Sequence, residues 1–129
     1  MNMRKRKKPL ILFSICLIIL IGYIANARSR LPESYYQKIW CDERNGITEF
    51  VLPDKARCDC LTDEYAVEFD FAKKWAEAIG QSLYYASQTG KKPGIVLIMD
   101  GEKDEKYLKR IMAVVEFYDL PIKVLSMAR

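Results

Sequence analysis

The 129-residue sequence contains no histidine, and this absence excludes several chemistries at once. Without an imidazole the chain cannot form a Ser-His-Asp triad, a Cys-His dyad or a histidine-ligated zinc site, and it has no imidazole general base. Its length fits one domain. The hydrophobic fraction of 50% and the aromatic fraction of 12% exclude a fully disordered chain.

The net charge of +4 is distributed unevenly along the chain. Residues 1–30 contain seven of the 21 basic residues and no acidic residue. The remainder therefore carries 14 basic and 17 acidic residues, a net charge of −3. Tight non-specific binding of DNA usually needs several Lys or Arg side chains aimed at phosphates. The folded part is therefore not a bulk polyanion binder, although a local basic patch remains compatible with its composition.

The first thirty residues have the layout of a secretory signal or a membrane anchor. A basic cluster at 4–8 precedes an apolar run at 10–24, and small residues spaced A-x-A follow at 25–27. Counted from Pro9 to Ala27, the apolar stretch has 19 residues, close to the roughly 20 that cross a bilayer. A buried core helix is disfavoured because the stretch is apolar on every face. We expect the following organisation: a cytoplasmic leader at 1–8, an uncleaved transmembrane signal anchor or a cleaved signal peptide at 9–27, a linker at 28–33 and a folded domain at 34–129.

Both interpretations of the N-terminal segment leave the basic cluster in the cytoplasm and place everything after Arg28 on the other side of the membrane. The protein would then be membrane-bound or exported. The cysteines do not decide the compartment. Alternate side chains of an extended strand lie roughly 7 Å apart, which prevents an unstrained bridge between Cys58 and Cys60. A disulfide from Cys41 to one of them and three buried free thiols are both compatible with the sequence.

Hydrophobic periodicity and turn residues predict the element order α-β-β-β-α-β-α-β. This order predicts an α/β fold with a mixed five-stranded sheet flanked by helices. Three strands before the first crossover helix argue against a doubly wound fold. The expected helices cover 34–44, 73–89 and 102–118, and the expected strands cover 47–52, 57–62, 65–71, 94–99 and 122–125.

Four carboxylates lie in or beside the three-strand segment: Glu49, Asp59, Glu68 and Asp70. Glu68 and Asp70 are two residues apart in an alternating strand, so they project from the same face. Adjacent like charges on a central strand would repel and resist burial. A Mg²⁺ or Mn²⁺ ion held by these oxygen ligands would remove the conflict. The alternative is the solvent face of an edge strand, with Asp59 as an acid beside a turn.

The helix that follows this strand offers further polar groups. Lys74, Glu77, Gln81 and Tyr84 share one helix face. If that face is packed behind the carboxylates, Lys74 and Gln81 point at the same pocket. Lys74 would then act on an attacking water or on a developing phosphate charge. The alternative is an ordinary solvent-exposed helix face.

The stretch Arg57-Cys-Asp-Cys-Leu-Thr-Asp-Glu-Tyr-Ala-Val-Glu-Phe-Asp and the helix through Gly80-Gln-Ser-Leu-Tyr-Tyr resemble the PD-(D/E)XK nuclease superfamily. The resemblance covers about residues 34–100, and the αβββαβ order agrees with the restriction-endonuclease-like core of that family. It implies that Asp59 is the motif Asp, Glu68 the motif Glu and Gln81 the helix Gln. Glu43 or Glu49 would supply the additional acid of some members.

The chain departs from the family pattern at one position, because Asp70 stands where the motif has lysine and the triplet is E-F-D. Some members of the superfamily carry the functional lysine on the following helix. Lys74 is the best candidate for that role here, with Lys73 behind it.

The resemblance implies a Mg²⁺- or Mn²⁺-dependent nuclease, in which Asp59 and Glu68 hold the metal, assisted by Asp70 or Glu49. The catalytic set would be Asp59, Glu68, Lys74 and Gln81, and a basic path for nucleic acid would come from Lys91, Lys92 and Arg57. A second reading is a catalytically inactive nuclease-fold module, tethered to the membrane by the N-terminal segment, that serves binding or assembly. A third is an unrelated α/β domain whose acids form a hydrated face.

Overall fold

The computed structural model describes residues 13–22 and 31–129, and residues 13–22 are helical. Residues Pro32–Arg129 form a compact unit. No helix in the described ranges is both long enough and apolar enough to cross a membrane. Much of the expected leader and span falls at residues 1–12 and 23–30, outside the described residues, so the signal peptide or anchor stays a prediction.

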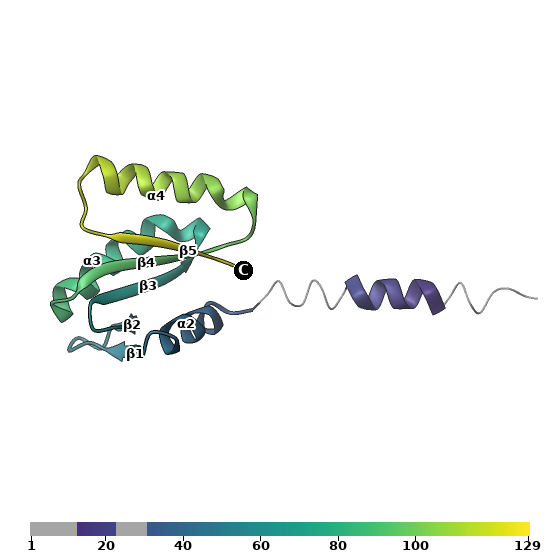
Figure 1. Ribbon diagram of the computed structural model, residues 1–129, viewed down its shortest axis with the longest axis horizontal. Coiled ribbons are helices and arrows are strands. Elements are labelled where there is room, and N and C mark those ends of the chain that lie inside the picture. Colours follow the sequence, from purple (N-terminus) through teal and green to yellow (C-terminus); the bar gives the residue numbers. More distant parts are fainter. Residues whose placement is uncertain (1–12, 23–30) are drawn as a thin grey trace, which may run out of the picture. The chain divides into compact units, whose positions relative to one another are not determined.

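The folded unit has the element order that the sequence predicts, and the expected α/β class with a mixed five-stranded sheet is confirmed (Figure 1). The helices are α2 (Glu33–Asp42), α3 (Trp75–Thr89) and α4 (Glu105–Phe117), with 3₁₀ turns η1 (Ala72–Lys74) and η2 (Glu102–Asp104). The strands are β1 (Ile47–Val51), β2 (Arg57–Leu61), β3 (Tyr65–Phe71), β4 (Lys92–Met99) and β5 (Lys123–Ala128).

The sheet keeps its strands in chain order, β1-β2-β3-β4-β5. The β1–β2 and β2–β3 pairs are antiparallel, whereas β3–β4 and β4–β5 are parallel. Parallel neighbours need a crossover connection, which α3 supplies between β3 and β4 and α4 between β4 and β5. Strand β3 therefore lies at the centre of the sheet, with partners on both edges.

Helices cover both faces of the sheet. Ile95 and Leu97 of β4 pack into the core beneath α3 and α4, whereas Val96 packs with Phe69 on the face that carries α2. Figure 1 shows α3 and α4 on one side of the sheet and α2 beside β1 and β2. The all-apolar run of β4 is thus explained by burial on both faces.

Most element boundaries differ from the sequence prediction by one to three residues; the first residues of the expected 102–118 helix, for example, form the 3₁₀ turn η2. The start of the expected 73–89 helix is the 3₁₀ turn η1, and β4 begins at Lys92 instead of Gly94. Strand β5 continues to Ala128, three residues beyond the predicted end. Its last residues pair with β4 as far as Met99↔Ala128, so their extended conformation comes from the neighbouring strand and not from local side-chain preference.

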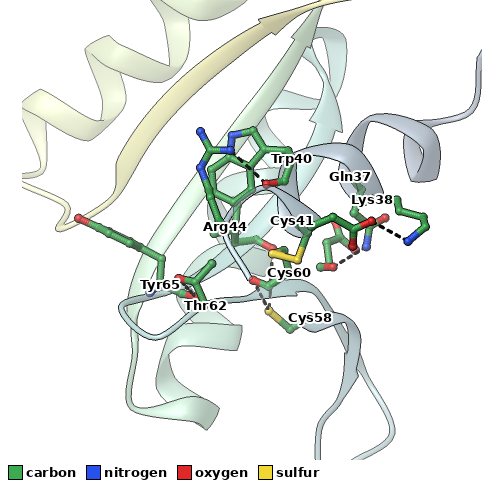
Figure 2. Close-up of a disulfide and its surroundings, with 12 residues drawn as sticks. Gln37, Lys38, Trp40, Cys41, Arg44, Cys58, Cys60, Thr62 and Tyr65 are labelled. Atoms are coloured by element: carbon green, nitrogen blue, oxygen red, sulfur yellow. Dashed lines mark hydrogen bonds and ion pairs between the residues drawn. A yellow bond between two sulfur atoms is a disulfide. The ribbon is translucent and has the colours of Figure 1, made fainter. Parts of the chain in front are cut away.

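A disulfide between Cys41 and Cys60 joins α2 to β2 (Figure 2). Cys58 remains a free, buried thiol, and burial raises its pKa to about 11. The alternative of three free thiols is therefore wrong. Gly46 lies against both bridged sulfur atoms, and a Cβ at this position would lie 2.6 Å from each. The bridge fixes one face of α2 against β2, which matters for the site described next.

Candidate functional site

An open cavity of about 530 Å³ contains most of the site residues that the sequence predicts. We call it the acidic pocket. The two central strands β2 and β3 contribute carboxylates, and α2, η1 and α3 complete the wall. Its lining residues are Glu33, Asp59, Glu68, Asp70, Lys74, Glu77, Gly80 and Gln81.

Glu68 and Asp70 are buried at the floor of the acidic pocket, with 3% and 2% of their surface exposed. Glu68 Oε2 and Asp70 Oδ1 have no hydrogen-bond partner among the described residues. The alternative that these acids form the solvent face of an edge strand is wrong. Strand β3 has neighbours on both edges, and α3 packs against the face that carries these acids, so both faces of the strand are buried.

Asp59 is held between β2 and β3 by backbone contacts. The regular pairing of these strands reaches Cys60↔Val67, and beyond it the Phe69 amide donates to Asp59 Oδ2 at 2.8 Å. The side-chain carboxylate thus takes the place of a strand carbonyl. The Asp59 carbonyl accepts a hydrogen bond from Gln37 Nε2 of α2 at 2.6 Å. These contacts fix the position of the Asp59 carboxylate in the pocket.

The crowding of acids shifts their protonation. Burial, followed by the charge and the hydrogen bond of Asp59, raises the pKa of Glu68 to about 10. Burial also raises the pKa of Asp59 to about 6, opposed by the hydrogen bond from the Phe69 amide. Burial raises the pKa of Asp70 too, against the contact with Lys74. At neutral pH without a bound cation, Glu68 is therefore a neutral acid that shares its proton with the Asp59 carboxylate.

Glu33, in the first turn of α2, is the pocket residue that the sequence analysis missed. Burial, together with the charges of Asp70 and Asp59, raises its pKa to about 7. The signal that could have found it is the spacing of Glu33, Gln37 and Cys41, which places all three on one face of α2.

The two additional acids that the sequence suggested do not line the acidic pocket. Glu43 caps the exposed C-terminal end of α2 and pairs with Arg44 at 3.5 Å. Glu49, expected as a metal ligand, accepts a hydrogen bond from Gln37 at 3.0 Å and pairs with Arg57 at 3.3 Å. Glu49 is therefore linked to the pocket residue Asp59 through Gln37, and its charge adds to the rise in the pKa of Asp59.

Lys74 lies at the edge of the acidic pocket with its ammonium group toward the acids. Its Nζ is 3.3 Å from Asp70 Oδ1 and 3.9 Å from a carboxylate oxygen of Glu77. The contact with Asp70 is an ion pair that lacks hydrogen-bond geometry, so Oδ1 remains unsatisfied. Asp70 is nevertheless the main reason that the pKa of Lys74 is raised. Lys74 is therefore a firmly protonated ammonium group and not a base.

The remaining predicted helix residues separate into two groups. Glu77 and Gln81 line the acidic pocket, and Gln81 Nε2 also donates to the Tyr85 hydroxyl at 3.3 Å. Tyr84 does not line the pocket, because its hydroxyl donates to Asp54. The sequence predicted that Lys74 and Gln81 of this helix face point at one pocket, and both line it, whereas Tyr84 of the same face contacts Asp54 instead.

The expected basic path does not run along the acidic pocket. Lys92 pairs with Glu64 at 2.8 Å, and Lys91 donates to the Asp63 carbonyl at 2.7 Å. Lys92 lies opposite Tyr65, five residues before Asp70 on β3, which is roughly 16 Å along a strand. Arg57 pairs with Glu49. All three cations are therefore engaged with groups outside the acidic pocket lining, and Lys92 lies at the far end of the strand from Asp70.

The residues present fit a hydrated divalent cation better than a preformed metal cage. Within residues 13–22 and 31–129, no three Cys, Asp or Glu side chains are already arranged to hold a metal ion. However, Mg²⁺ commonly uses one or two carboxylates and keeps several waters. Such a cation would coordinate the two buried carboxylate oxygens that lack hydrogen-bond partners. It would also displace the proton that Glu68 shares with Asp59.

No protein-family model, curated protein or solved structure matches the chain. The resemblance to the PD-(D/E)XK nucleases therefore depends on the residues and their arrangement alone.

Proposed function

We propose that the acidic pocket is the active site of a Mg²⁺- or Mn²⁺-dependent nuclease, on a divergent restriction-endonuclease-like fold. The observation that carries this proposal is the burial of Glu68 and Asp70, each with an unsatisfied oxygen, beside Asp59 and Lys74 in one open cavity. Burying carboxylates together costs stability unless a ligand compensates for it. Strongly shifted carboxyl pKa values in a cleft are typical of functional sites.

Asp59 and Glu68, once the shared proton is displaced, would hold the cation between them. Asp70 Oδ1, which lacks a hydrogen bond and has only the ion pair with Lys74, would be a further ligand. The bound cation would supply a hydroxide nucleophile at neutral pH and neutralise charge on the phosphate. The backbone hydrogen bonds to Asp59 keep this ligand in place before the cation arrives, so little reorganisation is needed on binding.

The other pocket residues have roles that follow from their charge states. Lys74, held as an ammonium by Asp70, stabilises the negative charge that develops on the phosphate oxygens. Glu33, with its pKa near 7, accepts a proton from the attacking water. The water oxygen bonds to phosphorus, the ester P–O bond breaks and the leaving oxygen takes a proton from solvent. Gln81 orients the substrate from the rim.

We also propose that this domain acts on the non-cytoplasmic side of a membrane, either anchored or exported. The basic cluster at 4–8 favours that topology. The Cys41–Cys60 disulfide supports it, because such bridges persist mainly in oxidising compartments. The substrate would then be extracellular or periplasmic nucleic acid.

Metal-dependent cleavage tests the proposed function. The full chain, purified in detergent, should cut end-labelled DNA or RNA in Mg²⁺ or Mn²⁺ and not in EDTA. Asp59→Asn should lower the rate at least about a hundredfold, because it removes a charged ligand while the amide oxygen can still accept from Phe69. Glu49→Gln is the matched control, since Glu49 lies outside the pocket lining, and it should cut at nearly the wild-type rate.

Equal cleavage by the wild-type protein and Asp59→Asn would contradict the proposal and indicate a contaminating nuclease. Failure of the wild-type protein to cut any strand in either metal would also contradict it. In that case the tethered, non-catalytic module becomes the better reading, because Asp70 occupies the position of the motif lysine.

A further inference from the structure

A second cavity, of about 580 Å³, adjoins the acidic pocket and has the opposite charge. We call it the basic cleft. Lys74 lines both cavities, so the two share a wall. The basic cleft lies where the parallel strands β3, β4 and β5 end, and this carboxyl edge is the usual ligand site of such sheets. Its lining residues are Phe71, Lys73, Lys74, Asp100, Lys103, Asp104, Lys106, Tyr107 and Arg129.

The basic cleft concentrates positive charge on a domain that is acidic as a whole. Five cationic side chains and two carboxylates line it, a local net charge of +3, whereas residues 31–129 have a net charge of −3. Asp100 pairs with Lys103 and with Arg129, and Asp104 accepts a hydrogen bond from the Asp100 amide. Both carboxylates are therefore already engaged.

Two of the cations in the basic cleft are available for a ligand. Lys73 and Lys106 are exposed and make no ion pair with any residue that the structure describes. The Lys106 ammonium lies 4.9 Å from the centre of the Tyr107 ring, and the Arg129 guanidinium lies 5.0 Å from that of Phe71. The Tyr107 ring thus holds the Lys106 ammonium at the wall of the cleft without neutralising it, whereas Arg129 is also paired with Asp100.

We propose that the basic cleft binds backbone phosphates of the nucleic-acid strand next to the phosphate that is cut. This inference rests on the proposed function of the acidic pocket and names the surface that holds its substrate. Lys73 and Lys106 come from separate elements, η1 and α4, and both line the cleft without an ion-pair partner among the described residues, so each can contact a phosphate of the bound strand. Contacts of this kind are independent of sequence and weaken steeply with salt.

Binding without cleavage tests this inference. The full chain in detergent and EDTA is titrated with a fluorescent 20-nucleotide strand of DNA or RNA at several salt concentrations. The double variant Lys73→Gln/Lys106→Gln should weaken binding at least about tenfold and reduce the salt slope by about two. The matched control Lys38→Gln/Lys109→Gln has the same net charge and changes exposed lysines outside the cleft lining, so it should bind like the wild type.

The outcomes separate this inference from the proposed function. Equal weakening in both double variants, or no binding by the wild type, would overturn the cleft proposal even if the protein cuts nucleic acid. Equal competition by inorganic phosphate and by an unlabelled strand, at the same phosphate concentration, would also overturn it. So would binding to anionic phosphatidylserine vesicles without binding to the strand. Cleft-dependent binding without metal-dependent cleavage would support the cleft and refute the nuclease.

Discussion

Lowering the pH from 8 to 6 is expected to stabilise the metal-free protein by at least about 2–3 kcal/mol, the contribution of Glu68 alone. Burial raises the pKa of Glu68 to about 10, whereas the ordinary value is 4.5. Between these values the folded state binds one more proton than the unfolded state, so stability falls as the pH rises, by about 1.4 kcal/mol per pH unit. The expected change is opposite in sign to that of an acid whose native pKa is lowered by a salt bridge.

The absence of histidine simplifies the interpretation of this pH dependence. No other side-chain type has an ordinary pKa between pH 6 and 8 when histidine is missing, so the shifted carboxyl groups dominate the pH dependence. Urea unfolding in EDTA at pH 6, 7 and 8 measures the effect. Glu68→Gln, which mimics the protonated acid, should remove most of the dependence of the unfolding free energy on pH. Glu77→Gln is the control, because Glu77 lines the same pocket but its side chain is 68% exposed, and it should keep the slope.

A stability that does not change, or that rises, between pH 6 and 8 in the wild-type protein would contradict the buried, protonated state of Glu68. If the unfolding free energy of Glu68→Gln depended on pH as steeply as that of the wild type, the effect would come from other groups. Glu33 and Asp59 would be the first to examine.

Replacing Lys74 by methionine is expected to slow cleavage by about 10²–10³-fold. The long apolar side chain retains the packing of the lysine stem but removes the ammonium that lies 3.3 Å from Asp70. Losses of this size are typical when one group that stabilises transition-state charge is removed. The loss should fall on kcat, because the lysine acts on charge that develops during the reaction. Lys109→Met, on the exposed face of α4, is the control and should keep its activity.

The neighbouring lysine distinguishes chemistry from substrate binding. Lys73 lines the basic cleft and not the acidic pocket, so Lys73→Met should raise KM and leave kcat nearly unchanged. If Lys74→Met cuts as fast as the wild type, the helix lysine does not replace the missing motif lysine. If Lys74→Met and Lys73→Met both change only KM, Lys74 belongs to the cleft alone.

The alternation of apolar and polar residues along β3 was enough to predict that Glu68 and Asp70 share a face. It could not show whether that face is buried, because burial depends on α3 packing against the strand. The polar face of α3 predicted the neighbours Lys74 and Gln81 correctly. It also included Tyr84, whose hydroxyl is drawn away by Asp54 from the β1–β2 turn, a residue thirty positions earlier.

The features that the sequence could not predict depend on contacts between segments that are far apart in the chain. Glu33 joins the site because α2 is fixed by the Cys41–Cys60 bridge, and the pairing of these cysteines follows from the fold and not from their spacing. The basic cleft brings Lys73, Lys106 and Arg129 together from η1, α4 and the end of the chain. The sequence instead drew attention to the adjacent pair Lys91 and Lys92, which the strand direction places at the other end of the sheet.

Calorimetric titration of the metal-free full chain with Mn²⁺ at pH 7 tests whether the acidic pocket binds a divalent cation. We expect one bound ion per chain and the release of about one proton, the proton that Glu68 shares with Asp59, detected by repeating the titration in buffers of different ionisation enthalpy. Glu68→Gln should bind at least about a hundredfold more weakly and release no proton. Absence of saturable binding by the wild type, or equal binding by Glu68→Gln, would show that the buried carboxylates do not form a cation site.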